Sequence, residues 1–347
     1  MKKVLFFLIV LVVVSHSTLA QKRSDQNPVT YEELYDEPYA INTLFVQFQP
    51  IYGELYTANI NAGFGLEATY FLKDKMRFNA QARQAYTRKF DLSRDIAENI
   101  KDEENSGLTL EPASFNYYQV GATYHIKDFE ESSKTKMFLY KKSYKGDKWA
   151  SRVPLNTDVP CKVRKIYGAR LGGFYFDTSF DLNRVMEAQG KTLQDLEGPN
   201  GMTLPTTKPN NSEENFQAYS NMAVGGIYVG GSMSWIKNIA VDFDNKYQEG
   251  VDDLILTTYL DILIAPSINV DDVTFQGNTY SSDAVDTSII GFRAGLEGRF
   301  NRTWSWAYGG EIGMRPGLQK RGFYALLKIS FPVFSTNLDY SVEAFGR

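Results

Sequence analysis

Apolar and polar residues alternate strictly along several segments of the chain. Between residues 61 and 70 the even positions are Ala, Phe, Leu, Ala and Tyr, while the odd positions are Asn, Gly, Gly, Glu and Thr. Successive side chains of a β-strand face opposite sides of its sheet, so one face of this segment is apolar and the other polar. The pattern predicts a β-strand with two chemically different faces.

The alternation resumes after a short polar interruption at residues 73–75. From residue 76 to residue 83, Met, Phe and two Ala alternate with Arg77, Asn79, Gln81 and Arg83. Two alternating runs joined by three residues predict a β-hairpin. A second hairpin is predicted around Asn301-Arg302, because the alternation holds on both sides of that pair.

Ten segments of the chain carry this signal. The predicted strands are residues 42–52, 60–72, 76–88, 114–126, 162–176, 222–235, 252–265, 287–300, 303–315 and 320–332. Each is long enough to cross a bilayer as a tilted strand, which takes about 9–11 residues. An even number of strands places both termini at one end of a barrel, which in bacterial outer-membrane barrels is the periplasmic end. The long polar segments 89–113, 177–221 and 266–286 then lie at the extracellular end, and the turns at 73–75 and 301–302 lie at the periplasmic end.

Two connections at the periplasmic end are unusually long for such a barrel, residues 127–161 and 236–251. The first contains an apolar piece, so residues 136–143 also fit a strand. If each connection hides additional strands, the barrel has twelve strands instead of ten. We keep twelve strands as the alternative.

The N-terminus has the three parts of a secretory signal peptide. Lys2 and Lys3 precede an apolar run from Val4 to Val14, and small residues end at Ala20. This pattern predicts export and cleavage after Ala20. The eleven-residue run is too short to span a bilayer as a helix, which needs about 20 residues. Cys161 lies far from the cleavage site, so it carries no lipoprotein anchor. Because it is the single cysteine of the sequence, it forms no internal disulfide.

Composition removes several other classes of protein. The formal net charge is −4, which is not the basic footprint of a nucleic-acid binder. After residue 20 no stretch approaches 18 consecutive apolar residues, so transmembrane helices are not expected. Apolar and polar residues also alternate along the strands of a soluble β-sandwich. In this sequence, however, charged residues repeatedly occupy the face opposite the apolar one, and aromatic residues gather at the ends of the strands. The fold class we expect is all-β, an antiparallel transmembrane β-barrel of about ten strands with long extracellular loops.

With these strands, this signal peptide and these aromatic strand ends, the chain resembles outer-membrane β-barrel proteins of Gram-negative bacteria, of the kind found in Bacteroidota. The resemblance covers about residues 42–332 and is architectural. It implies a place in the outer membrane, contact with lipid and lipopolysaccharide, and insertion by the outer-membrane assembly machinery. The end of the chain departs from the family pattern of a terminal aromatic residue, because Phe331 is followed by a proline and a tail that contains Phe345.

The expected organisation has four parts: signal peptide 1–20, periplasmic leader 21–41, barrel 42–333 and C-terminal tail 334–347. The leader mixes carboxylates with tyrosines. Its default state is an unstructured segment. The alternatives are docking on a periplasmic partner protein and folding back into the lumen as a small plug.

The chain offers little for catalysis or metal binding. After the signal peptide only His125 remains as a histidine, and the nearby Asp128 and Glu130 supply no nucleophile. We therefore interpret His125 as a hydrogen-bonded lumen residue and expect no enzyme activity, no metal site and no cofactor. Residues 242–246 lack the glycine and glutamate of a calcium loop and are interpreted as a solvated turn. The aspartates at 271, 272, 283 and 286 fit a solvated charge cluster better than a divalent-ion or lipopolysaccharide-bridging calcium site.

Glycine pairs at residues 225–226 and 230–231 lie within a predicted strand and lack the strand-to-helix context of a phosphate loop. We expect them to allow a bend or close backbone approach in the barrel wall.

The polar faces of the strands form the candidate site. A lumen charge network is predicted from Glu67, Arg77, Arg83, Arg170, Arg293, Glu297, Arg299, Glu311 and Arg315. In a narrow barrel these charges fill the lumen as ion pairs, which is a structural plug. In the alternative, an excess of arginine along one wall makes a weak anion-preferring path. Large aqueous channels occur at about 16–18 strands, which favours the plug. We therefore expect a structural or binding barrel acting through its extracellular loops on an extracellular ligand, with a small channel as the alternative and a barrel enzyme as the weakest candidate.

Overall fold

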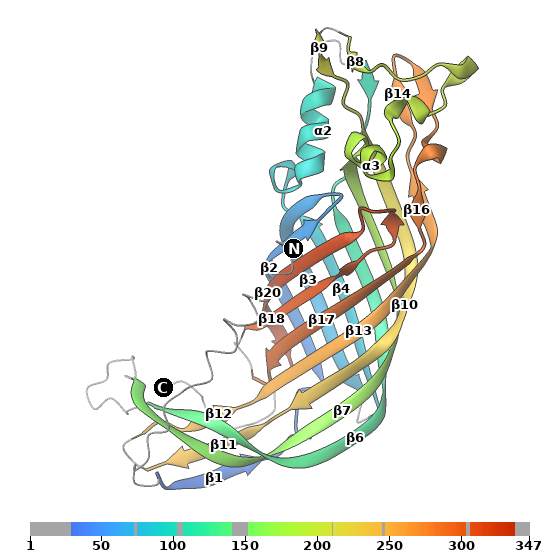
Figure 1. Cartoon of the computed structure of the whole chain (residues 1–347). Helices are drawn as coiled ribbons and strands as arrows, with labels where there is room; N and C mark the ends of the chain where they lie inside the picture. Colours follow the sequence, from blue (N-terminus) through green and yellow to red (C-terminus); the bar gives the residue numbers. More distant parts are fainter. Residues whose placement is uncertain are drawn as a thin grey trace, which may run out of the picture.

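The computed structural model describes residues 29–72, 75–102, 107–140, 152–209, 211–244, 247–302 and 306–336. Ten antiparallel strands close into a barrel (Figure 1). They are β2 (Leu44–Tyr56), β3 (Ile60–Leu72), β4 (Met76–Ala85), β6 (Asn116–Tyr140), β7 (Arg152–Asp181), β10 (Tyr219–Ile236), β13 (Leu254–Val270), β17 (Ile290–Phe300), β18 (Ala307–Met314) and β20 (Phe323–Ser335). Each pairs with its neighbour in chain order, and β20 closes the ring on β2. The predicted ten-strand all-β barrel is confirmed.

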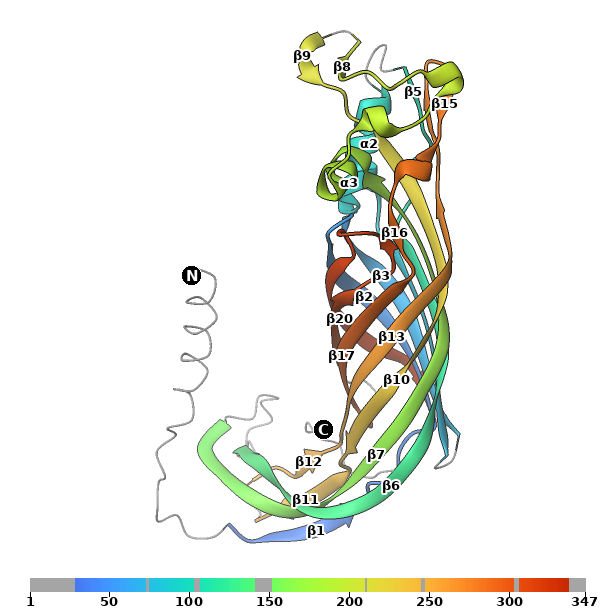
Figure 2. The same ribbon diagram turned by 45° about the vertical axis from the view of Figure 1, so that its right-hand side comes forward.

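The alternative of twelve barrel strands is wrong, although the two long connections do contain strand. Residues 127–140 of β6 and 152–167 of β7 stay paired with each other beyond Tyr124, where the pairing of β6 with β4 ends, and we call this pair the arm. Residues 236–251 contain β11 (Ile239–Phe243) and the start of β12 (Gly250–Asp252), which join a separate three-stranded sheet instead of the barrel. Figure 2 shows the arm curving away from the barrel axis beside this small sheet.

The third strand of the small sheet comes from the predicted leader. β1 (Tyr31–Asp36) pairs antiparallel with β11, with Tyr31 opposite Phe243. The expectations of an unstructured leader and of a lumen plug are therefore wrong for residues 31–36. Propensity alone could not reveal this strand, because its partner lies more than 200 residues away. The signal peptide 1–20 and residues 21–28 of the leader lie outside the described residues.

An apolar core joins the arm to the small sheet. Its fully buried members are Met137, Leu139, Val159, Cys161, Val163, Ile239, Val241 and Phe243. The lone cysteine, Cys161, is thus a core residue, and burial raises the pKa of its thiol. This core fixes the arm at the end of the barrel where the described chain begins, and we call this the arm end.

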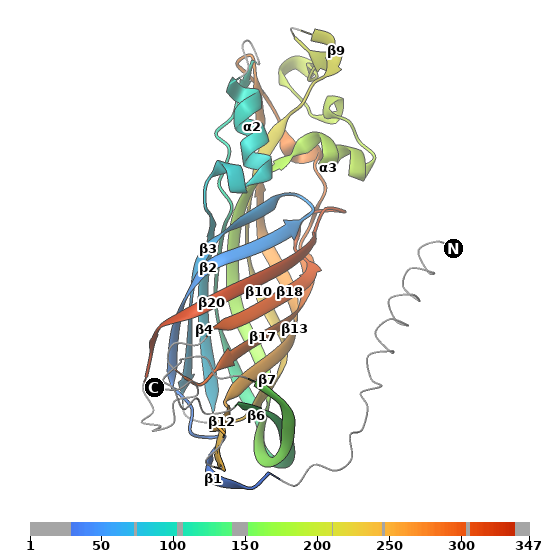
Figure 3. The same ribbon diagram turned by 90° about the vertical axis from the view of Figure 1, so that its left-hand side faces the viewer.

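The opposite end of the barrel, the cap end, carries folded loops (Figure 3). We call these loops the cap. Their elements are α2 (Leu92–Asp102), α3 (Leu182–Gln189), β5 (Leu108–Thr109), β8 (Thr207–Lys208), β9 (Asn211–Asn215), β14 (Val273–Phe275), β15 (Asn278–Tyr280), β16 (Thr287–Ser288), β19 (Gly317–Leu318) and four short 3-10 helices at Arg88–Phe90, Leu193–Asp195, Pro199–Gly201 and Ser282–Ala284.

The segment 177–221, predicted as a long polar segment at the extracellular end, is folded over its described residues. Leu182, Met186 and Leu196 are fully buried, in one cluster with Phe180 of β7 and Phe216. The helix α3 begins after Asp181, whose side chain accepts a hydrogen bond from the Arg184 N–H, and it ends at Gly190 in the left-handed conformation. The polar composition of this segment concealed a small set of apolar residues at core positions.

Asp91 attaches α2 to the rim of the barrel. Its carboxylate accepts hydrogen bonds from the Phe115 N–H and from Asn59 Nδ2, both at 2.7 Å. Burial raises the pKa of this carboxyl group despite these donors. The position of α2 therefore depends on a buried polar contact with the barrel.

The two chain ends differ from the sequence expectation in small ways. Phe331 lies on β20 and is half exposed, and the strand continues two residues past the predicted barrel boundary, to Ser335. Phe345 and residues 337–347 of the predicted tail lie outside the described residues. Within the described part of the chain, no helix is long and apolar enough to span a membrane.

Glycine makes room for large side chains inside the barrel. Tyr228 is fully buried and lies against two neighbouring strands, where a Cβ added to Gly121 or Gly172 would sit 1.9 Å or 2.6 Å from its side chain. Two of the glycines predicted to allow close backbone approach, Gly226 and Gly230, do so. A Cβ added to them would lie 2.4 Å from the Ile264 carbonyl oxygen and 2.2 Å from the Leu260 carbonyl oxygen, respectively. The inner wall is therefore close-packed, and side-chain size there is constrained by the backbone of adjacent strands.

We predict that Gly172→Ala lowers the free energy of unfolding by about 1–3 kcal/mol, the usual cost of overpacking. The new methyl group would meet the Val120 carbonyl oxygen at 2.3 Å as well as the Tyr228 ring. The neighbouring substitution Gly173→Ala is the matched control, because its Cβ meets nothing closer than 3.6 Å. Denaturant unfolding in detergent would measure both, and equal stabilities would contradict the packing argument.

Candidate functional site

The two faces of the barrel wall have opposite chemistry. On β13, Leu260 and Ile262 are 61% and 53% exposed, whereas Asp261 between them is completely buried. On β20, Leu327 is 75% exposed and the adjacent Lys328 is 5% exposed. Apolar side chains therefore cover the outside, while charged side chains point into the lumen.

The structure brings all nine residues of the predicted charge network into the lumen. Their positions are on β3 (Glu67), β4 (Arg77, Arg83), β7 (Arg170), β17 (Arg293, Glu297, Arg299), β18 (Glu311) and just after β18 (Arg315). Eight of them are buried, and Glu297 has a side chain that is 22% exposed. Their ion pairs fall into three clusters along the barrel axis, and tyrosine side chains connect the first two.

The cluster nearest the cap is centred on Glu54, which sequence reasoning missed. The two carboxylate oxygens of Glu54 accept hydrogen bonds from Arg315 Nη1 and Nη2 at 2.5 and 2.7 Å. Arg83 Nη1 lies 3.8 Å from the same carboxylate. The bidentate geometry orients Arg315 firmly, since both N–H groups on one side of the guanidinium are engaged.

Aromatic rings surround these two arginines. The Arg315 guanidinium lies 4.3 Å from the centre of the Tyr324 ring, and the Arg83 guanidinium lies 4.3 Å from that of Tyr117. Cation–π contacts of this kind stabilise a charge that is removed from water. They matter most for Arg83, because none of its three side-chain nitrogens donates a hydrogen bond to a described residue.

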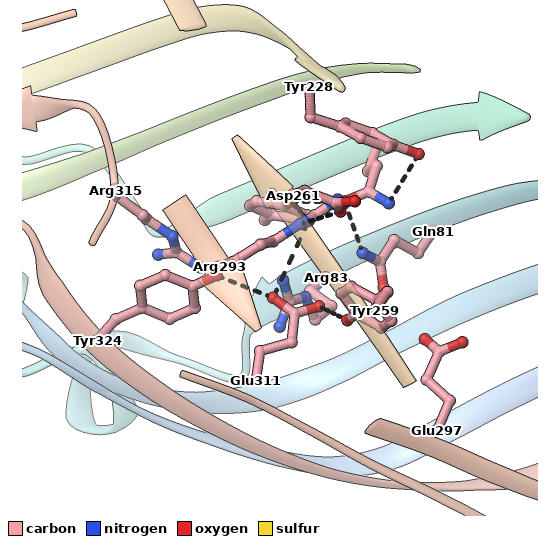
Figure 4. A network of polar contacts seen from close by, with 12 residues as sticks. Gln81, Arg83, Tyr228, Tyr259, Asp261, Arg293, Glu297, Glu311, Arg315 and Tyr324 are labelled. Carbon is pink, nitrogen blue, oxygen red and sulfur yellow. Dashed lines mark hydrogen bonds and ion pairs between the residues drawn. The ribbon is translucent and has the colours of Figure 1, made fainter. Parts of the chain in front are cut away.

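The middle cluster is built around Asp261, the second residue that was missed. Its two oxygens accept hydrogen bonds from Arg170 Nε and Arg293 Nε, each at 2.9 Å. Figure 4 shows Asp261 beside Arg293. The Arg293 Nη1 atom also donates to the Tyr117 hydroxyl at 3.1 Å. One fully buried carboxylate thus neutralises part of the charge of two buried guanidinium groups.

Glu311 adds a second carboxylate beside Arg293 in this middle cluster. It accepts hydrogen bonds from the hydroxyls of Tyr259 at 2.8 Å and Tyr324 at 3.1 Å. Its carboxylate lies 4.0 Å from Arg293 Nη1. Tyrosine hydroxyls therefore satisfy the acceptor capacity that the arginines leave open.

The cluster nearest the arm end is centred on Lys328, the third residue that was missed. Its ammonium group donates to Glu67 Oε2 at 2.6 Å and to Glu297 Oε1 at 3.1 Å. Arg299 Nη2 lies 3.8 Å from Glu297. Lys328 therefore links β20 to the carboxylates of β3 and β17 across the lumen.

Arg77 differs from the other lumen cations. It donates one hydrogen bond, from Nη1 to Thr257 Oγ1 at 3.0 Å, and within the described residues no carboxylate lies at ion-pair distance. Counted over the described residues, these clusters and Arg77 comprise seven cations and five carboxylates. The lumen therefore carries a small positive excess.

Little free space remains among these side chains. A cavity of about 20 Å³ lies beside Arg77, Arg170 and Arg299, bounded on another side by Glu67 and Glu297. This volume holds on the order of one water molecule. The lumen beside these five charged side chains is thus filled.

The remaining sequence candidates take structural positions. His125 is half-buried where β6 bulges at the start of the arm, opposite Gly168. Asp271 accepts a hydrogen bond from Asn221, and Asp272 accepts one from Ser282, so both carboxylates hold loops of the cap. Asp242 lies within β11 instead of in a turn. Among the described residues, no group of three or more potential metal ligands occurs.

The chain matches no protein-family model and no curated protein sequence.

We predict that Asp261→Asn destabilises the barrel by about 3–5 kcal/mol, the usual cost of breaking a buried ion pair. The substitution keeps the size of the side chain but leaves the Arg170 and Arg293 guanidinium groups without their shared carboxylate. Glu98→Gln, at the surface pair with Arg94 in α2, is the control and should cost a small fraction of that loss.

Denaturant unfolding of both variants in detergent would measure the difference. Combining Asp261→Asn with Arg170→Gln should recover part of the stability, since one unpaired buried charge is removed. An Asp261→Asn protein as stable as the Glu98→Gln control would show that Asp261 does not neutralise the lumen.

Proposed function

We propose that this chain is an integral outer-membrane β-barrel with a filled lumen, whose role is structural or binding and is exerted through the cap. The observation that carries this proposal is the polarity of the wall, with charges buried inside and apolar side chains exposed outside. A soluble barrel gains stability by burying its apolar face, so the reverse arrangement would be unfavourable in water. In a bilayer the same arrangement is favourable, and a closed ring leaves no unpaired strand edge in lipid.

Aromatic side chains at both ends of the outer wall support this assignment. At the arm end, Tyr70 stacks on Phe78, and Trp306 packs beside Phe300. At the cap end, Tyr118 stacks on Tyr175. Membrane barrels carry girdles of aromatic residues at the two interfaces, which separate an apolar band from water.

The orientation follows from the connections. The described chain begins and ends at the arm end, and bacterial barrels with an even number of strands have their termini in the periplasm. The cap would then face outward, next to lipopolysaccharide, and the arm would lie on the periplasmic side. Insertion by the outer-membrane assembly machinery and export by the predicted signal peptide are parts of the same proposal.

A binding role fits the cap better than transport fits the lumen. The cap is folded around an apolar cluster that it shares with the barrel strands, and the charged clusters fill the barrel beneath it. The role we propose is therefore non-catalytic presentation of the cap to an extracellular ligand. The second candidate is a small anion-preferring channel, which the excess of lumen cations and the unpaired Arg77 favour.

We expect the refolded mature protein to be electrically silent in a planar bilayer, because ion pairs and tyrosines fill the lumen. Single-channel recording would test this, with insertion verified separately by protease protection. Steady openings with anion selectivity in a salt gradient would contradict the filled lumen and favour the channel. An Arg77→Gln variant should reduce that selectivity if the channel is real.

We also predict that a cysteine placed at Ser212, an exposed position of β9, reacts with a membrane-impermeant maleimide on intact cells. The matched control is a cysteine at Glu32, an exposed position of β1, which should react only after the outer membrane is permeabilised. Both variants would carry Cys161→Ser to remove the natural thiol. Labelling at Glu32 but not at Ser212 would reverse the orientation, and labelling of neither after permeabilisation would mean that the protein is absent from the envelope.

A further inference from the structure

A groove with a volume of about 430 Å³ lies on the outer wall where the arm leaves the barrel. Clefts that hold small ligands usually have volumes of about 300–1,000 Å³. One side of the groove is the outward face of β13, with Leu254, Leu256 and Thr258. The other side is the arm, with Val163 of β7 and Ser133 of β6, and Trp235 of β10 lies between the two sides.

The groove continues the outward apolar face of the barrel. Leu256 and Thr258 occupy the same face of β13 as Leu260 and Ile262, which are 61% and 53% exposed. A molecule in contact with that exposed face can therefore extend along β13 into the groove, passing one polar side chain of that face, Thr258. The arm lies beside this part of the wall, so β13 and the arm bound the groove on two sides.

Charges of both signs border the groove. Lys165 forms an ion pair with Glu131, and both belong to the groove lining. Lys237 also lines the groove, and its ammonium group lies 3.0 Å from Asp252. The aliphatic stem of a lysine packs on apolar surface while its ammonium group reaches water, so these pairs mark the polar edge of the groove.

We propose that the groove binds one zwitterionic phospholipid of the surrounding membrane, with an acyl chain between β13 and the arm and the headgroup at the lysine–carboxylate pairs. The inference rests on the proposed outer-membrane location. Apolar continuity with the barrel wall selects an acyl chain as the occupant. A rim that carries both ammonium and carboxylate groups complements a headgroup that carries phosphate and ammonium together. The arm thereby attaches the barrel to the periplasmic leaflet.

Tryptophan fluorescence offers a direct test, because the chain has four tryptophans and Trp235 lines the groove. One single-tryptophan variant keeps Trp235 and replaces the other three with phenylalanine. The matched control keeps Trp306, which is 49% exposed on the outer wall at the same end of the barrel. Both are refolded into phosphatidylcholine vesicles whose acyl chains carry bromine, a contact quencher.

We expect a loss of Trp235 fluorescence comparable with that of Trp306, and little effect of aqueous iodide on Trp235. Quenching of Trp306 without quenching of Trp235 would overturn the lipid site and leave the membrane proposal intact. Iodide would then distinguish a groove filled with water from one covered by another part of the chain. Absence of quenching at both positions would instead overturn the membrane location.

A difference measurement covers the case in which the single-tryptophan variants do not refold. The protein with all four tryptophans is compared with its Trp235→Phe variant in the same brominated vesicles. If an acyl chain contacts Trp235, bromine quenches the part of the fluorescence that Trp235 emits. The Trp235→Phe variant should then lose a smaller fraction of its fluorescence to bromine than the protein with all four tryptophans. If that fraction is unchanged by Trp235→Phe, no acyl chain contacts Trp235 and the lipid site is wrong.

Discussion

Charge neutralisation inside a closed ring is the constraint on which the rest of this structure depends. Asp261 can serve Arg170 and Arg293 together only if β7, β13 and β17 hold their present register around the lumen. A shift of one residue would turn these charges outward and the leucines beside them inward. The ion pairs and the apolar outer wall therefore specify the same register, and each would be lost without the other.

The same constraint explains the distribution of glycine and tyrosine. Tyrosines supply hydroxyl donors to Glu311 and ring faces to the arginines, but their side chains are too large to lie beside other side chains on the adjacent strands. Glycines opposite Tyr228 and Tyr259 leave the space they need. The buried tyrosines and the glycines opposite them are thus a consequence of filling a charged lumen.

Local periodicity predicted the ten strands because alternation is a property of neighbouring residues, and it placed nine charged residues on the lumen face. Asp261 and Lys328 lie within predicted strands. Extending the alternation along those strands would have placed both side chains on the lumen face. Glu54 could not be assigned in this way, because irregular pairing between Phe48 and Ile51 shifts the inward positions of β2 from odd to even. The small sheet was not predictable either, since β1 and β11 meet only in the folded chain.

Apolar packing closes the cap end of the barrel, and this bears on function. A single apolar cluster joins barrel residues such as Tyr56 and Phe176 to cap residues such as Met186 and Leu196. Moving the cap aside would expose this cluster, and a solute would still meet the bonds of Arg315, Asp261 and Lys328 below it. Passage through the lumen therefore requires two separate rearrangements, each costly. Recognition of a ligand at the outer surface of the cap requires neither rearrangement. Binding is therefore compatible with the folded structure as it stands, whereas transport is not.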